Sequence, residues 1–383
     1  MAERIPVTPA IITWARERSG VTRKEAVKKF KDVLDWEQGR SYPTYNQIER
    51  MADAFKVPVA VFFFPEPPDL PPISETFRTL PLSEMERLPS RIRLLLRKAK
   101  AMQINLEELT EGRNPSFKLI TRDLSFQIDS DISSMAAEVR EYIGISIDEQ
   151  MGWSDDDTAL RSWRAALTGV GVFVFKDAFK ADDFSGFCLF DDAFPVIYVN
   201  NSSTKTRQMF SFFHELGHLL FHTSGIDTLH HQFITRLKSD DQRVEAICNR
   251  FASEFLLPEN ALNQALRGRE ASEETAEILA SQFHVSREVV YRRFLDRGLV
   301  SSRQYQKAAD RWSQQRQEGK RTGGDHYWTK LTYLGRDYVS LALSQFYRNR
   351  IDENQLADYL DTKPRNLSKL EEYFDRGQLD VRV

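Results

Sequence analysis

The sequence has few cysteines, no long apolar run and little net charge, so it lacks the features of disulfide-rich exported proteins, membrane proteins and proteins whose whole surface binds nucleic acid. Its two cysteines, Cys188 and Cys248, cannot supply the several disulfides on which small extracellular scaffolds depend. No apolar run approaches the ~18 residues of a membrane span, and the first residues carry no apolar signal segment. We therefore expect a cytoplasmic protein with buried free thiols and no membrane partner.

The sequence also lacks a large excess of either positive or negative charge. The formal net charge is −3, from 53 Lys and Arg against 56 Asp and Glu, which excludes a surface built as a whole for nucleic acid. Any contact with DNA must be local. The length of 383 residues suggests two to three domains, and a hydrophobic content of 41% suffices for their cores.

The most informative segment is His214 to His218, which spells H-E-x-x-H inside an apolar run, 209–221, that predicts a helix. Histidines at i and i+4 project from one helical face, so both imidazoles can reach one tetrahedral Zn²⁺. Glu215 lies between them, where a carboxylate can act as the general base that takes a proton from water. The pattern predicts zinc-assisted hydrolysis of an amide.

Catalytic zinc usually has three protein ligands, so a third ligand should follow the motif. His222 lies one turn further on but is rotated off the stripe of the two histidines. Glu245 is favoured, because it begins a stripe with Asn249 and Ala252 on a second predicted helix that stops at Pro258. Glu254 falls on the opposite face of that helix and is a distant alternative.

Other polar residues of the second predicted helix have supporting roles. Asn249 is placed for second-shell hydrogen bonding to the metal ligands. Asp240 and Asp241 are expected at its N-cap or in its first turn.

These blocks resemble the ImmA/IrrE family of metallopeptidases. Val199-Asn200, the segment from Arg207 to His222, Glu245 and the segment from Asn249 to Pro258 occur in the family's order. The similarity covers roughly residues 130–300 and includes Trp163 and the apolar stretch 171–175. Many members have Glu-Ala-Asn adjacent, whereas this chain spaces Glu245 and Asn249 further apart.

The resemblance implies an α+β, mostly helical protein with a zincin-like core and a small sheet. It implies Zn²⁺ bound by His214, His218 and Glu245, with Glu215 as catalytic base. The function implied is a gluzincin-like endopeptidase that cleaves a regulatory protein, such as a helix-turn-helix repressor or antitoxin, in a stress, mobile-element or toxin–antitoxin setting. The alternative is a DNA-binding transcriptional regulator whose peptidase fold acts as a sensor.

A hairpin is predicted just upstream of the metal motif. Residues 185–190 and 195–199 read as short strands separated by Asp191-Asp192. An exposed edge of such a sheet could bind a peptide substrate by strand addition.

The first 65 residues resemble the λ repressor/Cro type of helix-turn-helix, with short helices over 8–18, 22–30, 33–36 and 44–55. The segment that would read DNA is short and carries Asp32 and Asp35, which phosphates repel. DNA binding is possible through this domain, but docking of a protein partner or homodimer formation is at least as well supported.

We divide the chain into a helix-turn-helix-like domain 1–65, a Pro-rich linker and helical connector 66–129, a peptidase domain 130–300 and a C-terminal helical domain 301–383. The linker begins at Pro65-Glu-Pro-Pro and is followed by a long helix over 89–109 with a basic face. Residues 283–295 and 355–370 repeat a helix-turn-helix-like pattern, which three-helix packing alone can produce.

Overall fold

The computed structural model describes residues 3–55, 57–68, 88–181, 183–223, 226–228, 239–318 and 325–379. The rest of the Pro-rich linker lies outside these ranges. The chain divides into two compact units, Met1–Lys98 and Ala99–Val383. Each is described by itself.

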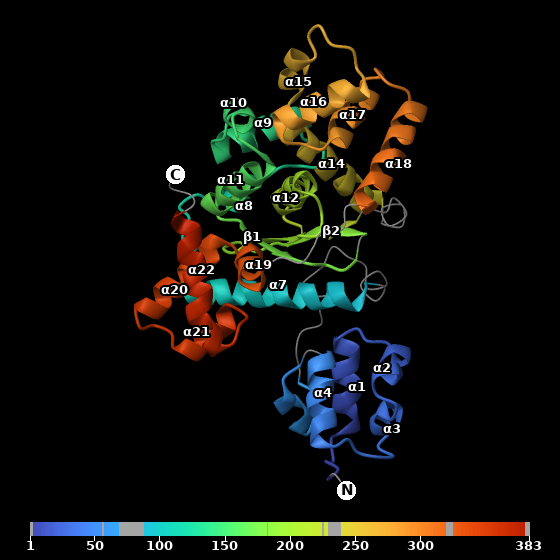
Figure 1. Ribbon diagram of the computed structural model, residues 1–383, viewed down its shortest axis with the longest axis vertical. Helices are drawn as coiled ribbons and strands as arrows, with labels where there is room; N and C mark the ends of the chain where they lie inside the picture. The colour runs from blue at the N-terminus through green and yellow to red at the C-terminus, as the bar shows by residue number, and fades with distance from the viewer. Residues whose placement is uncertain are drawn as a thin grey trace. The chain divides into compact units, whose positions relative to one another are not determined.

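The first unit is a bundle of short helices (Figure 1). Its elements are α1 (Pro9–Arg18), α2 (Arg23–Lys29), α3 (Val33–Glu37), α4 (Tyr45–Phe55) and the 3₁₀ turn η1 (Val59–Phe63). Thr22 and Glu25 form a capping box that fixes the start of α2. Ile11, Trp36 and Phe55 are buried in the core, so the four predicted helices are confirmed.

The sheet of the second unit has four strands in the order β1-β3-β2-β4. They are β1 (Phe173–Asp177), β2 (Phe184–Leu189), β3 (Val196–Asn200) and β4 (Ile226–Thr228). β1 runs parallel to β3, whereas β2 is antiparallel to both β3 and β4. Asn200, at the end of β3, accepts from the Phe179 amide at 3.3 Å and donates to the Phe184 carbonyl at 3.0 Å, which ties β3 to the chain beside β1 and β2.

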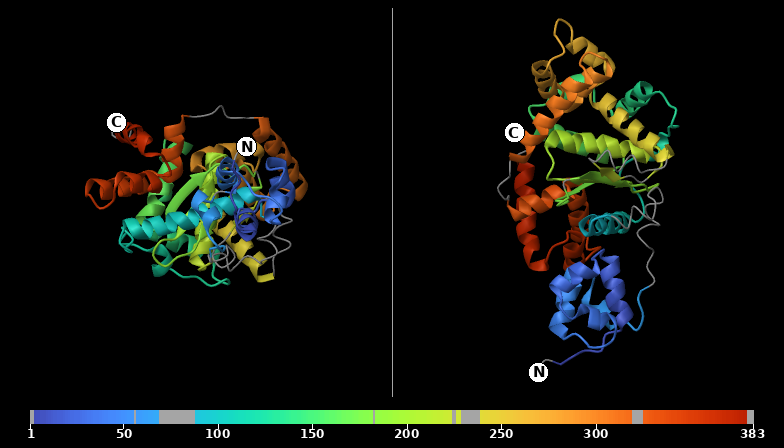
Figure 2. Two further views of the ribbon diagram at one scale, coloured as in Figure 1. Left: turned by 90° about the horizontal axis from the view of Figure 1, so that it is seen from below. Right: turned by 90° about the vertical axis from the view of Figure 1, so that its right-hand side faces the viewer.

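Every residue of β1, β2 and β3 is buried, because helices cover both faces of the sheet. Helix α12 (Lys205–Leu220) packs on one face, and α19 (His326–Leu334) and the part of α7 (Ser90–Leu109) that belongs to this unit, from Ala99 on, lie on the other (Figures 1 and 2). Gln103 of α7 donates to the carbonyls of Leu189 and Phe194 at 3.3 and 3.1 Å. The long helix predicted over 89–109 is confirmed.

The remaining helices of this unit surround α12 and the sheet. They are α8 (Ile120–Asp123), α9 (Ile132–Ile143), α10 (Ile147–Met151), α11 (Asp156–Gly169), α14 (Ser239–Leu256), α15 (Glu259–Ala265), α16 (Glu273–Phe283), α17 (Arg287–Asp296), α18 (Ser302–Glu318), α20 (Arg336–Tyr347), α21 (Glu353–Tyr359), η2 (Pro364–Asn366) and α22 (Leu367–Leu379).

An aromatic cluster locks α12 against α11 and α14. The Trp163 ring meets Phe213 edge-on at 4.9 Å between centroids, and Phe213 stacks on Phe255 at 4.1 Å. Aromatic pairs of this geometry add to the stabilisation from buried area. The helix that carries the metal motif therefore packs against both α11 and α14. The helices and the small sheet together confirm the predicted α+β, mostly helical fold class.

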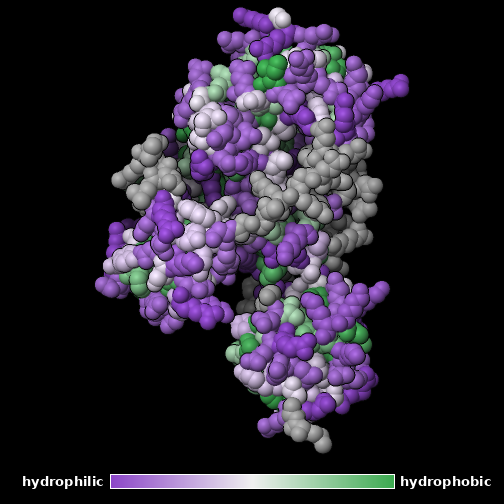
Figure 3. All heavy atoms as spheres, viewed as in Figure 1, coloured by the Kyte–Doolittle hydropathy of each residue, from purple (hydrophilic) through white to green (hydrophobic). Residues whose placement is uncertain are grey.

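Hydrophilic residues cover most of the face seen in Figure 3, with apolar residues scattered among them. Within the described ranges, no helix combines the length and the apolar character that a bilayer crossing requires.

Candidate metal centre

Helix α12 carries the H-E-x-x-H motif in its buried half. His214 and Glu215 are fully buried and His218 is 3% exposed. The one-turn spacing brings the Nε2 atoms of the two histidines to 3.2 Å. Two imidazole nitrogens therefore converge on one point in the interior.

A glycine lets α14 approach this part of α12. A Cβ at Gly217 would lie 3.1 Å from the Sγ of Cys248 and 3.3 Å from the Phe251 ring. A methyl group at this position would require the side chains of Cys248 and Phe251 to shift by a few tenths of an ångström. The close packing carries Glu245, three residues before Cys248, toward the histidines.

Glu245 reaches both imidazoles with its two carboxylate oxygens. Oε1 lies 3.2 Å from the Nε2 of His218, and Oε2 lies 3.4 Å from the Nε2 of His214. Burial by itself would raise the pKa of the Glu245 carboxyl, but its interactions with His218 and His214 outweigh burial and hold the pKa well below its usual range. The carboxylate is therefore ionised and available as a ligand.

The geometry of these three donors fits a tetrahedral metal ion. Zinc bonds to imidazole nitrogen and carboxylate oxygen of about 2.0–2.1 Å place neighbouring ligand atoms roughly 3.3–3.4 Å apart at the corners of a tetrahedron. The two Nε2 atoms lie 3.2 Å apart, and each has a different oxygen of Glu245 beside it, at 3.4 Å for His214 and 3.2 Å for His218. Among the described residues, His214, His218 and Glu245 form a buried group that could hold a metal ion, with one ligand atom from each within 4.8 Å of the others.

Glu215 lies between the two histidines in the sequence, but it is not one of the three candidate metal ligands. Its carboxylate faces the backbone of β2, where a Cβ built on Gly186 would lie 3.3 Å from Oε1 and 3.6 Å from Cγ. The missing side chain at position 186 allows this approach. Strand β2 therefore positions the Glu215 carboxylate.

Asn249 contacts the site through the backbone. Its Nδ2 donates to the carbonyl oxygen of Glu245 at 3.0 Å, one turn back along α14. The hydrogen bond is local to the helix and does not reach the Glu245 carboxylate. The side chains of Asp240 and Asp241, expected at the start of this helix, lie outside the described residues.

The two alternative ligands lie elsewhere. Helix α12 ends at Leu220, and His222 adopts a left-handed φ of 55°. Its Nε2 lies 3.0 Å from the carbonyl of Thr121. Glu254 pairs with Arg293 at 2.6 Å and caps the Glu259 amide at 2.9 Å. Neither is part of the His214, His218 and Glu245 group.

Thr223 supports His218 and was missed by reasoning from the sequence. Its hydroxyl donates to the His218 carbonyl at 2.9 Å and lies 3.5 Å from Nδ1 of the same histidine. If Nδ1 donates to this oxygen, Nε2 keeps the lone pair that a metal needs. A lone threonine after a helix gives no signal in a sequence.

The hairpin expected upstream is present, with β2 and β3 paired antiparallel. Its β2 strand is not an open edge, because β4 pairs with its other side. The three residues of β4 are too few to show an alternating pattern. β4 pairs with Phe184, Gly186 and Phe187 of β2, and strand addition at an exposed edge of the sheet stays a prediction.

Comparison with known proteins supports a peptidase-related domain. Residues 168–295 match the family model of the IrrE N-terminal-like domain, Peptidase_M78. This range contains His214, Glu215, His218 and Glu245.

Among solved structures, a Mycobacterium tuberculosis transcriptional regulator is similar, with 17% identity and a TM-score of 0.30. The similarity covers 43% of this chain and 46% of that protein, so the chain spans less than half of its length. A TM-score this low does not establish a shared fold. No curated protein matches the sequence.

Proposed function

We propose that this chain is a zinc-dependent endopeptidase. The observation that carries the proposal is the convergence of His214, His218 and Glu245 at tetrahedral spacing beside the buried carboxylate of Glu215. Two imidazoles and a carboxylate form a donor set typical of catalytic zinc. The match of the surrounding residues to a peptidase family supports the same conclusion.

In this proposal His214, His218 and Glu245 hold the metal, which when bound polarises the scissile carbonyl and acidifies a water. Glu215 is the general base that takes the proton of the attacking water and passes it to the leaving amine nitrogen. Gly186 keeps room for its carboxylate, and Thr223 holds the His218 ring.

We propose a regulatory protein as the substrate, such as a helix-turn-helix repressor or an antitoxin, in the cytoplasm. We retain the division into domains 1–65, 66–129, 130–300 and 301–383, and the helix-turn-helix assignment of the first, as parts of this proposal. Helix α3, which would read DNA in such a module, has five residues. Its Asp35 is paired with Arg40 at 2.9 Å, which removes a cation from DNA contact.

We therefore assign residues 1–65 to the recruitment of a protein partner or to self-association, rather than to reading an operator. Homodimer formation through this domain is compatible with the assignment. The alternative function, a DNA-binding regulator with a sensor domain, does not require a general base at position 215.

The test is Glu215→Gln, which keeps the size of the side chain and removes its ability to accept a proton. Wild type and variant are each co-expressed with the products of neighbouring genes, and new protein termini are identified by mass spectrometry. We expect cleavage by the wild type and a loss of roughly 10²–10⁴ in rate for the variant, with equal metal content. The matched control is Glu277→Gln, an exposed glutamate of α16.

Cleavage at the wild-type rate by Glu215→Gln would refute the role of this residue. If no partner gives Glu215-dependent cleavage, the sensor alternative is favoured.

A further inference from the structure

The C-terminal helices leave a hollow between them that the proposed peptidase activity does not use. Helices α20, α21 and α22 line a cavity of about 90 Å³. Protein interiors normally contain few voids larger than a water molecule. This one has the volume that roughly three waters occupy in the liquid.

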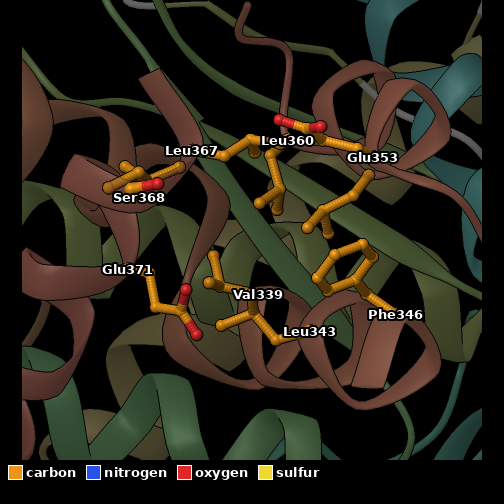
Figure 4. Close-up of a pocket in the computed structure, with 10 residues that line it drawn as sticks. Val339, Leu343, Phe346, Glu353, Leu360, Leu367, Ser368 and Glu371 are labelled. Carbon is orange, nitrogen blue, oxygen red and sulfur yellow. The ribbon is translucent and has the colours of Figure 1, made fainter. Parts of the chain in front are cut away.

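The lining of the cavity is apolar and comes from all three helices. Val339 and Leu343 of α20 face Leu356 and Leu360 of α21, and residues of α22 close the third side. Figure 4 shows Val339, Leu343 and Leu360 around a common space. The valine and leucine side chains of this lining favour a hydrocarbon group, while Ser368 and the two glutamates contribute polar surface.

Two carboxylates flank the apolar lining. Glu353, the first residue of α21, and Glu371 of α22 lie on opposite sides of it (Figure 4). Within the described part of the chain, the Glu353 carboxylate has no hydrogen bond or ion pair, and Glu371 accepts from the hydroxyl of Tyr347 alone. The negative charge at the mouth is therefore not balanced by a neighbouring cation.

The size of the cavity decides what class of occupant it can take. Pockets for metabolites and cofactors have volumes of roughly 300–1,000 Å³, several times that of this cavity. A volume of about 90 Å³ suits one aliphatic side chain. Protein interfaces often depend on a single apolar residue that enters such a pocket, with charged groups at its rim.

We infer that this cavity is an anchor site for a protein partner, which inserts one leucine-sized side chain flanked by lysine or arginine. The apolar lining takes the anchor, and Glu353 and Glu371 attract the flanking cations. The inference goes beyond the proposed peptidase activity, because it concerns binding by the C-terminal helices and requires neither metal nor cleavage.

The experiment uses the full chain with isotopically labelled methyl groups and a short synthetic helical peptide. The peptide has one central leucine, with a lysine one helical turn to either side. We expect shifts in the methyl signals of Val339, Leu343, Leu356 and Leu360 that saturate with peptide. Replacing the leucine of the peptide with alanine should weaken binding about tenfold or more, because a buried leucine contributes most of the contact.

Charge is tested separately from the apolar anchor. Glu353→Gln and Glu371→Gln should each weaken binding a few-fold, as does replacement of the peptide lysines with glutamates, whereas Glu277→Gln should have no effect. Leu343→Phe fills the cavity and should abolish the methyl shifts. A thermal melt checks that each variant folds, and the two charge variants carry the test if Leu343→Phe does not.

Equal binding of the leucine and alanine peptides would overturn the inference, as would the absence of any methyl shift. Binding that is indifferent to both glutamates would also overturn it. Because no cleavage is measured, these outcomes are independent of the fate of the proposed peptidase activity.

Discussion

Replacing His218 with alanine should remove the metal and the stability that the metal provides. His218 lies 3.2 Å from both other donors, the Nε2 of His214 and the Oε1 of Glu245. Without His218, only His214 and Glu245 remain as ligands for the metal. Zinc bound by two residues on separate helices lacks the ligand number that structural and catalytic sites share.

The size of the effect follows from mass action. A metal that binds only the folded state at a free concentration of one hundred times its Kd stabilises the protein by about 2.7 kcal/mol. An unfolding entropy of about 2.1 cal/mol/K per residue over the second unit, Ala99–Val383, means that each kcal/mol raises the Tm by about 1.7 °C. Zinc should therefore raise the melting temperature of the wild-type second unit by about 4–5 °C, and that of His218→Ala by almost nothing.

The assay compares metal-stripped protein melted with and without added zinc, and elemental analysis gives the metal content of each sample. His222→Ala is the matched control, because His222 lies just beyond the same helix and contacts the Thr121 carbonyl. It should retain both the metal and the zinc-dependent shift, whatever its own melting temperature. Equal metal in His218→Ala and wild type would refute the assignment, and so would loss of metal from His222→Ala.

Three further predictions concern other parts of the chain. Gly186→Ala would place a methyl group 3.3 Å from the Glu215 carboxylate, so cleavage should fall about tenfold at unchanged metal content; an unchanged rate would contradict the positioning role of β2. Glu37→Gln removes the buried carboxylate beside Arg16 and leaves it only the exposed Glu17, which should destabilise the first unit by about 3 kcal/mol and accelerate amide hydrogen exchange there; unchanged exchange would contradict this. Deletion of residues 1–65 should leave metal content unchanged but weaken processing of the partner. Nanomolar, sequence-selective duplex binding by these residues would instead favour an operator-reading role.

The sequence was most informative where the spacing of residues along a single helix determines which side chains lie together. The one-turn spacing of His214 and His218 depends only on the helix, and the helix itself was evident from its apolar residues. The stripe that begins at Glu245 identified the residue that the structure brings beside both histidines. Its role as a ligand stays a prediction until metal is measured.

The parts that could not be predicted depend on contacts between distant segments. Gly186 matters because β2 crosses beneath the Glu215 carboxylate, and Thr223 because the chain turns back toward His218 after the helix. The pairing of β4 with β2 was missed for the same reason. The spacing of apolar residues predicts helices and strands, but it does not predict which strand will pack beside which helix.

The strand order also has a consequence for the order of folding. β2 and β3 are neighbours in the sequence, and Asp191 closes their turn by accepting from the amides of Ala193 and Phe194, both at 2.9 Å. β1 must pair with β3 from the other side and in parallel, which requires closure of a longer loop. We therefore expect the hairpin to form first, and since α12 follows β3 after a short turn, we expect the two histidines to reach the sheet before β1 has paired with β3.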